Sequence, residues 1–288
     1  MIIAKHAYLI LAHKSDYVFR SLLRMIDDER NDIFIHMDKK NRTYKESETA
    51  GIVRKSRVYH CKPLKCTWGA FSIVKAELSL LHLATGTDHY SYYHLLSGQD
   101  LPIKSQDTIH NFFELNSGKE FIGFDSLQFN FHDRVRVYNI FQEVVGRRYS
   151  RVNDNFLAIQ KIGGIYRNKG VRYQKGHQWF SVSDEFARYL LSKERWIKEL
   201  FRFTFCPDEL FVQTVLINSP FSDNQYMKDY GDCCGSVMRK IDWRRGFPYI
   251  FHKEDFAELD EAQEMFARKF DENVDKEIID MIVERYGS

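Results

Sequence analysis

The chain has 288 residues, of which 44% are hydrophobic and 28% charged, and its formal net charge is +2 at pH 7. These proportions are those of an ordinary globular protein, and the length allows one large α/β domain or two small ones. The small net charge gives no general indication of a nucleic-acid partner. No apolar run approaches the ~18 residues that a membrane-spanning helix needs.

The first third of the chain alternates between strand and helix patterns. The short apolar start is interpreted as a first strand rather than a signal peptide, because no small-residue cleavage site follows it. Strand–helix alternation in units of this size predicts a mainly parallel sheet with helices on both faces. The expected elements are a strand at 7–13, a helix at 16–29, strands at 31–38 and 56–61, a helix at 68–85 and a strand at 90–103 that runs into a turn.

Polar side chains fall at the ends of these predicted strands. Ligands of parallel α/β sheets bind outside the carboxyl ends of the strands. Three such coincidences therefore predict a cleft at this edge of the sheet. The residues concerned are His13, His36, Asp38, Ser97, Gly98 and Asp100.

Residues 134–175 differ from the rest in composition. They contain ten lysines or arginines and two acidic residues, a local balance of +8. A solvated loop face, a flap that binds the acceptor, and contact with an anionic membrane surface all fit this pattern. Beyond the segment, the sequence predicts a strand and a helix at 176–191 with a cap near Ser183, and a helix at 208–216.

Two adjacent carboxylates, Asp208 and Glu209, follow Pro207 at the start of that last helix. Acidic residues and proline suit a first helical turn, because the unpaired N–H groups and the helix dipole favour negative charge there. Alternatively, Glu209 is a general base that is fixed on a rigid helix start.

The five cysteines are odd in number and lack metal-ligand spacing with histidine. The adjacent Cys233 and Cys234 are poorly suited to a structural disulfide. This usage predicts free thiols in a reducing cytoplasm.

Eight segments, taken in order from residue 7 to about residue 271, resemble the core-2/I-branching glycosyltransferase family. That family includes the β-1,6-N-acetylglucosaminyltransferases and the protein xylosyltransferases. "MFARKFD" and "SGQDLPI" are the most specific segments, and the order of the whole set is more specific than any single one. The segments are "AYLILAH", "IHMDKK", "TWGAFSIVKAEL", "YYHLLSGQDLPIKS", "GHQWFSVSDEF", "CPDELFVQTVL", "IDWRRGFPYIF" and "LDEAQEMFARKFD".

The resemblance implies a GT-A-like α/β fold with a mainly parallel central sheet flanked by helices. It implies one domain over residues 1–288, with a nucleotide-binding half (1–105) and an acceptor and catalytic half (106–288). The family's luminal disulfides and membrane anchor are not seen in this sequence, which predicts a compact bacterial-type member. We expect that member in the cytoplasm, with peripheral contact at the inner face of the membrane.

The resemblance also implies inverting transfer of a sugar from a UDP-sugar to a glycan hydroxyl, with Glu209 as the base. Such a displacement must deprotonate the acceptor hydroxyl while it attacks the anomeric carbon. Asp208 is then interpreted as a cap or as a residue that supports the acceptor and sugar site.

No metal or other cofactor is expected. Many GT-A enzymes hold a divalent metal with Asp-x-Asp, and "HMDKK" lacks that spacing. The resemblance implies instead that Lys269 and Arg245, with Arg244 as the alternative arginine, hold the diphosphate. From spacing alone, Lys269 is better interpreted as a solvated lysine of a helix or tail, and only the ordered set of segments favours the diphosphate role.

The same resemblance implies further residues of the nucleotide site. Asp38 is expected to bind the uracil or ribose, or else to cap the strand end. His13 is expected to line the nucleotide pocket or to be structural, and Trp68 to lie beside the nucleotide or in the core. At the position where the family sometimes has a base-stacking aromatic residue, this chain has Lys65.

Two residues are expected at the donor-sugar site. Asp100 binds sugar hydroxyls or caps its turn, and Trp179 stacks on a pyranose face. N-acetylglucosamine, xylose and another hexose are all open as the donor sugar. A glycan or a lipid-linked oligosaccharide of surface polysaccharide synthesis is the expected acceptor, and its linkage is open.

Two rival functions remain on the sequence. One is a retaining or metal-dependent glycosyltransferase that uses Asp38 and Asp100 around Mn²⁺. The other is a non-catalytic protein that binds a nucleotide sugar or a glycan. Retention of Glu209 together with both cations argues against simple binding, which needs no base.

Overall fold

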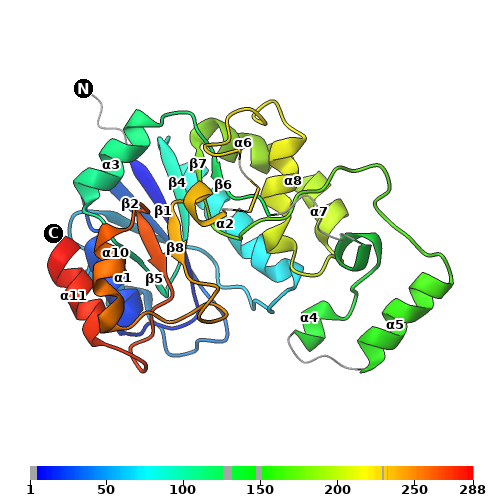
Figure 1. The fold of residues 1–288 in the computed structure, drawn as a ribbon, viewed down its shortest axis with the longest axis horizontal. Coiled ribbons are helices and arrows are strands. Elements are labelled where there is room, and N and C mark those ends of the chain that lie inside the picture. Colours follow the sequence, from blue (N-terminus) through cyan, green and yellow to red (C-terminus); the bar gives the residue numbers. More distant parts are fainter. Residues whose placement is uncertain (1–4, 126–131, 147–150, 229, 232, 288) are drawn as a thin grey trace.

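The structure is a computed structural model that describes residues 5–125, 132–146, 151–228, 230–231 and 233–287 (Figure 1). Its largest element is a six-stranded sheet in the order β3-β2-β1-β4-β7-β6, in which the first four strands are parallel and β7 runs antiparallel to β4 and β6. The strands are β1 (His6–Ala12), β2 (Asn31–Met37), β3 (Arg57–His60), β4 (Tyr92–Ser97), β6 (Phe121–Ile122) and β7 (Phe180–Ser183).

Helices cover both faces of this sheet. Successive side chains of β1 point to opposite faces, and both sets are apolar and need to be buried. Ala7 and Leu9 pack into one core with the helices α2, α6, α7 and α8, whereas Tyr8 and Ile10 pack into the other with α1, α3, α10 and α11. The predicted mainly parallel sheet with flanking helices is therefore confirmed. The helices are α1 (Tyr17–Met25), α2 (Phe71–Thr87), α3 (Gln106–Leu115), α6 (Asp184–Ser192), α7 (Glu194–Phe201), α8 (Phe211–Ile217), α10 (Phe256–Glu261) and α11 (Glu277–Tyr286).

A second sheet of three strands lies beside the first, in the order β5-β9-β8. The strand that runs into a turn within 90–103 is confirmed, since β4 ends at Ser97 and the chain turns at Gly98. The sequence pattern did not indicate the short strand β5, through which the chain then enters the second sheet. Gly98 approaches β1 closely, because a Cβ at this position would lie 3.2 Å from the Ala12 Cβ. The strands are β5 (Asp100–Pro102), β8 (Arg239–Ile241) and β9 (Phe266–Arg268).

The basic segment is partly helical rather than only a loop. It contains η2 (His132–Arg136), α4 (Gln142–Val145) and α5 (Arg151–Ile162), and Figure 1 shows α4 and α5 standing apart from the sheet. Residues 147–150, two of its ten cations among them, lie outside the described part.

The start of the predicted helix at 208–216 is also different. Pro207–Glu209 forms a 3₁₀ turn, η3, and α8 begins only at Phe211. The N-cap residues of these two elements are Cys206 and Leu210, so Asp208 is not a cap residue. The predicted cap at Ser183 is confirmed, because its hydroxyl accepts a hydrogen bond from the Phe186 N–H at 3.2 Å.

The remaining short elements connect these layers. They are η1 (Glu46–Gly51), α9 (Cys233–Ser236) and η4 (Lys253–Asp255). In the part of the chain that the structure describes, Cys61, Cys66 and Cys206 are free thiols. None of the described helices has the length and apolar content to cross a membrane.

Three histidines are buried together between the central sheet and α3. The His6 ring stacks on His110 with 4.0 Å between ring centroids, and His94 Nε2 lies 3.1 Å from His6 Nδ1. The other ring nitrogen of His94 contacts the Ser181 hydroxyl at 2.7 Å, and His110 Nε2 contacts Asn31 Oδ1 at 2.9 Å. Burial lowers the pKa of all three, and that of His110 to about 4.

These histidines predict a specific acid sensitivity. Each folded-state pKa lies below the unfolded value of about 6.5, so the unfolded chain binds more protons as the pH falls below that value. Each histidine is expected to remove about 1.4 kcal/mol of stability per pH unit between about pH 6.5 and its folded-state pKa. Urea titrations at several pH values measure this slope.

The variant His110→Gln is the matched test, because glutamine keeps a donor toward Asn31 and cannot be protonated. Its free energy of unfolding should depend less steeply on pH by about 1.4 kcal/mol per unit between about pH 6 and 5. Equal slopes in both proteins would contradict the role of the cluster.

Candidate active site

A cleft of about 190 Å³ opens at the carboxyl ends of β1, β2 and β4. This is where the polar residues at the strand ends predict it. Segments from the second half of the chain close its other side. Its lining residues are Leu11, Ala12, His13, His36, Asp38, Cys66, Ile73, Ser97, Gln99, Gln178, Trp179 and Arg268.

Asp38 is fixed at the mouth of this cleft by the turn after β2. Its N–H donates to the Ala12 carbonyl at 2.8 Å, and its carboxylate accepts from the Lys40 N–H at 2.8 Å. The Lys40 ammonium lies 3.2 Å from the second carboxylate oxygen. Asp38 thus caps the turn and also lines the cleft, and its binding of the uracil or ribose stays a prediction.

His36 anchors the loop that forms one wall. Its Nε2 accepts a hydrogen bond from the Leu64 N–H at 3.0 Å, and burial lowers its pKa, which suits the neutral form that this bond requires. The loop carries Lys65 and Cys66, and Cys66 lines the cleft.

Arg268 and Trp179 form the opposite wall. The Arg268 guanidinium lies over the indole ring, 4.5 Å from its centroid, and donates to Asp100 at 2.6 Å. The second oxygen of Asp100 accepts from the Ser97 N–H at 2.8 Å. Asp100 is therefore buried behind Arg268 and holds it, and it does not line the cleft.

His13 and Lys269 lie near each other, on the same side of the cleft as Asp38. His13 lines the cleft, and its pKa is lowered by partial desolvation and, to a smaller extent, by the cations of Lys14 and Lys269. Lys269 follows Arg268 directly, so β9 delivers two adjacent cations to this end of the sheet.

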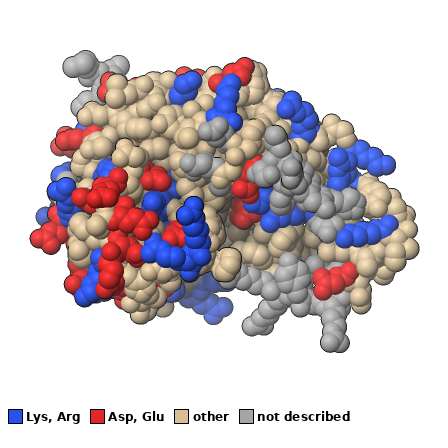
Figure 2. Space-filling model, in the orientation of Figure 1, with Lys and Arg blue, Asp and Glu red and all other residues tan. Residues whose placement is uncertain are grey.

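Arg245 is held elsewhere. Its guanidinium pairs with Asp242, with Asp255 and, at 3.0 Å, with Glu258, and it lies 4.1 Å from the centroid of the Tyr249 ring. Figure 2 shows acidic and basic side chains side by side over α10 and β8, the region of these ion pairs. Neither Arg245 nor the exposed Arg244 lines the cleft.

Glu209 lies on η3, next to the segment that delivers Gln178 and Trp179. Its carbonyl accepts from the Gly176 N–H at 2.9 Å. Its carboxylate, with a side chain 34% exposed, accepts from Arg134 Nη1 at 2.6 Å and lies 3.9 Å from the Lys175 ammonium. Lys175 pairs with Asp125 as well. The carboxylate is thus fixed by cations and open to solvent.

Trp68 lies nearer to this turn than to the cleft. Its ring meets Phe205 edge-on with 5.6 Å between centroids, and it is 41% exposed. The Arg134 guanidinium lies 5.5 Å from the centroid of the same Phe205 ring. Asp208 points into the protein, where burial and then the Glu209 charge raise its pKa to about 7.

The structure thus brings His13, Asp38 and Trp179 together and places Lys269 beside them. The sequence interpretation missed Gln178 and Arg268, although both stand next to predicted residues in "GHQWF" and "FARKFD". It also missed that Arg134 and Lys175 pair with Glu209. The unusual basic content of 134–175 was the available signal, but it did not indicate which cations face the carboxylate.

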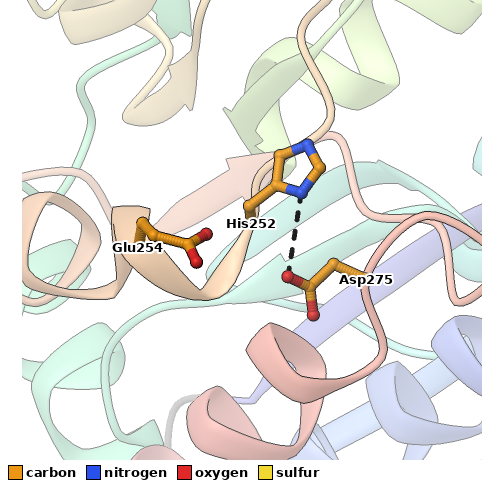
Figure 3. Close-up of side chains that lie close together, drawn as sticks. All are labelled: His252, Glu254 and Asp275. Atoms are coloured by element: carbon orange, nitrogen blue, oxygen red, sulfur yellow. Dashed lines mark ion pairs between the residues drawn. The ribbon is translucent and has the colours of Figure 1, made fainter.

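Among the residues that the structure describes, one group of side chains has ligand atoms close enough to hold a metal ion. It consists of His252, Glu254 and Asp275, whose ligand atoms lie within 4.8 Å of one another. Figure 3 shows His252 and Asp275 pointing toward each other, and their ion pair measures 3.7 Å. Asp275 also accepts from the Lys253 and Ile278 N–H groups at 2.9 and 3.1 Å, so its carboxylate already caps two turns. None of the three lines the cleft.

Comparisons with known proteins identify the family of the chain. The Core-2/I-Branching enzyme family model matches residues 6–260. The xylosyltransferase oxt of Drosophila melanogaster is 23% identical over 96% of this chain, and its Drosophila pseudoobscura counterpart is 22% identical. The chain spans about 30% of the length of these curated relatives.

Two solved structures show more distant likeness. Mouse xyloside xylosyltransferase 1 in its apo form is 10% identical, with a TM-score of 0.36 over 91% of this chain and 96% of that one. TarS residues 1–349 from S. aureus are 11% identical, with a TM-score of 0.29 over 58% of this chain and 51% of that one.

The match to the family model covers most of the chain, which therefore belongs to the Core-2/I-Branching enzyme family of glycosyltransferases. Its fold is the GT-A-like α/β arrangement that the resemblance implies. The sheet order and the two helical layers described above are its structural basis.

The two arginine environments predict different effects on nucleotide binding. Arg268→Met, combined with Asp100→Asn so that no buried carboxylate is left unpaired, should weaken UDP binding by about 10-fold or more, the typical value of a charge-assisted hydrogen bond. Lys269→Met should have an effect of similar size. Isothermal titration with UDP measures both.

Arg245→Met is the matched comparison. It removes ion pairs that lie away from the cleft, so it should lower the melting temperature and leave UDP affinity within about 2-fold. If Arg245→Met instead weakened UDP binding as much as the Arg268 variant, the original assignment of Arg245 to the diphosphate would stand.

Proposed function

We propose that the chain is an inverting glycosyltransferase that moves a sugar from a UDP-sugar to a glycan hydroxyl, with Glu209 as the general base. The observation that carries the proposal is the position of this carboxylate. It is partly exposed, fixed by Arg134 at 2.6 Å, and lies on a turn bonded to the segment that supplies Gln178 and Trp179 to the cleft. A carboxylate held in this way can take up the proton of an attacking hydroxyl.

The cleft itself offers suitable partners for the donor. A carboxylate such as Asp38 accepts hydrogen bonds from the N–H or O–H groups of a nucleoside. Arg268 and Lys269 provide fixed positive charge for a diphosphate leaving group, whose developing charge must be stabilised. Trp179 offers a ring to a pyranose, although Arg268 covers one face of it.

The donor sugar and the acceptor are proposed at the level of class. N-acetylglucosamine follows from the family resemblance and xylose from the xylosyltransferase relatives, and another hexose is equally compatible. For the acceptor, we propose a glycan or lipid-linked oligosaccharide of bacterial surface polysaccharide synthesis. The enzyme would then act in the cytoplasm at the inner face of the membrane, with the cations of the 134–175 segment toward an anionic carrier or surface.

A screen of the purified protein against UDP-, GDP- and dTDP-sugars tests the donor class. Sugar-nucleotide hydrolysis and thermal shift are the measurements, and both should favour UDP. Preference for GDP or dTDP would remove the argument that Asp38 binds uracil.

Glu209→Gln tests the base. Glutamine keeps the size of the side chain and an acceptor for Arg134 but cannot take up a proton, so turnover should fall by about 10²–10⁴-fold while donor affinity changes little. A merely structural first-turn charge would contribute only about 0.3–1 kcal/mol to stability.

Glu254→Gln is the control, because Glu254 lies in a comparable 3₁₀ turn, η4, away from the cleft. This variant should retain wild-type turnover. A correctly folded Glu209→Gln protein with near-normal turnover would leave the mechanism without a base.

Chelation tests the independence from metal. The residue two positions after Asp38 is Lys40, and its ammonium lies 3.2 Å from the Asp38 carboxylate, where the second aspartate of an Asp-x-Asp pair would stand. UDP affinity and transfer should therefore survive EDTA. Loss of both on chelation and their recovery with Mn²⁺ would favour the metal-dependent alternative through Asp38.

A further inference from the structure

Two carboxyl groups are buried behind the candidate base. Glu77, on α2, is 0% exposed, and Asp208, on η3, is 8% exposed. Burial is the main cause that raises the pKa of each, and each is raised further by a neighbouring carboxylate: Glu77 by Asp208, and Asp208 by Glu209. Such positions are costly for a charged carboxylate.

If Glu77 and Asp208 are both ionised, their buried oxygens have too few hydrogen-bond donors. Gln178 Nε2 donates to one oxygen of Glu77 at 2.6 Å. The other oxygen of Glu77, one oxygen of Asp208 and the side-chain oxygen of Gln213 are buried and have no hydrogen-bond partner. All three are acceptors, whereas a protonated carboxyl group is also a donor. A proton on Glu77 or Asp208 therefore turns a buried, unpaired acceptor into a group that can also donate.

The charged and titratable side chains near Glu77 and Asp208 do not neutralise the two carboxyl groups. Arg134 is the cation that lowers the pKa of Asp208, but its contribution is smaller than that of burial, and its guanidinium is bonded to Glu209. Cys66 and Cys206 also face the pair, and burial raises the pKa of both thiols, which keeps them neutral.

The pair joins the two functional parts of the site. Glu77 holds Gln178, which lines the cleft beside Trp179. Asp208 immediately precedes Glu209 in the 3₁₀ turn, and the Glu209 carbonyl accepts from the Gly176 N–H, two residues before Gln178. A change in the protonation or position of Glu77 or Asp208 would therefore shift both Gln178, in the cleft wall, and Glu209.

We propose that Glu77 and Asp208 form a buried acid pair that holds at least one proton at neutral pH and positions Gln178 relative to Glu209. Glu77 is thus a positioning residue for the transfer reaction, and this catalytic consequence rests on the proposed function. The protonation of the pair does not rest on it.

Infrared difference spectra test the protonation without any substrate. The wild-type protein at pH 7 should show a C=O stretching band of protonated carboxyl that is lost or shifted in Glu77→Gln and in Asp208→Asn. Wild-type spectra that match those of both variants in this region would overturn the proposal.

Kinetics test the positioning. Glu77→Gln replaces a protonated carboxyl with an amide of the same size that can still accept from Gln178, so turnover should stay within about 2-fold of wild type. Glu77→Met fills the same buried space but releases Gln178, and turnover should fall by about 10-fold to 10²-fold, the effect of a small misplacement of reacting groups. Equal turnover in the methionine and glutamine variants would overturn the positioning role.

Glu120 provides the matched control. It is another fully buried carboxyl, its pKa is raised to about 7 by burial, and it accepts from Ser183, away from the cleft. Glu120→Gln should change the infrared band but not the turnover, which separates loss of a buried acid from loss of the Gln178 contact. If the wild-type protein transferred no sugar at all, the proposed function would fail, whereas the infrared spectra would still decide for or against the shared proton.

Discussion

The site depends on one buried cation that joins the two sheets. Arg239, on β8, is 1% exposed and donates to the Leu95 carbonyl of β4 at 3.1 Å and the Phe180 carbonyl of β7 at 2.9 Å. Its guanidinium also lies 4.9 Å from the centroid of the Phe266 ring on β9. Burial lowers its pKa to about 10, which still leaves the group charged at neutral pH. A charge-assisted hydrogen bond to a backbone carbonyl inside a protein is strong and directional. These bonds therefore fix the position of the small sheet relative to the large one.

That placement explains why the cleft combines residues from distant parts of the chain. β1, β2 and β4 supply His13, Asp38 and Ser97 at one edge of the central sheet, and β9 brings Arg268 to the same edge. Asp100 connects the two sheets at this edge. It is the first residue of β5, directly after the turn that follows β4, and its carboxylate accepts a hydrogen bond from Arg268 at 2.6 Å. The turn at Gly98 is what allows one chain segment to contribute to both sheets.

Local patterns predicted the parts of the structure that depend on local physics. Apolar runs gave the buried parallel strands, and polar residues after β1 and β2 indicated the cleft. The pairing of Arg134 with Glu209 spans 75 residues and arises from packing between η2 and η3, which no periodicity encodes. The choice between Arg245 and Arg268 also lay beyond sequence spacing: the carboxylates around Arg245 come from turns and a helix that only the fold brings together.

The charges around Glu209 are arranged in two layers with opposite effects. On one side, Arg134 donates to the partly exposed Glu209 carboxylate and the Lys175 ammonium lies 3.9 Å from it. Behind it, Glu77 and Asp208 would repel that same charge if both were ionised in surroundings where water cannot screen them. Protonation of the buried pair removes the repulsion and leaves the cations unopposed. The two carboxyl groups can then serve as hydrogen-bonding groups without adding negative charge behind the proposed base.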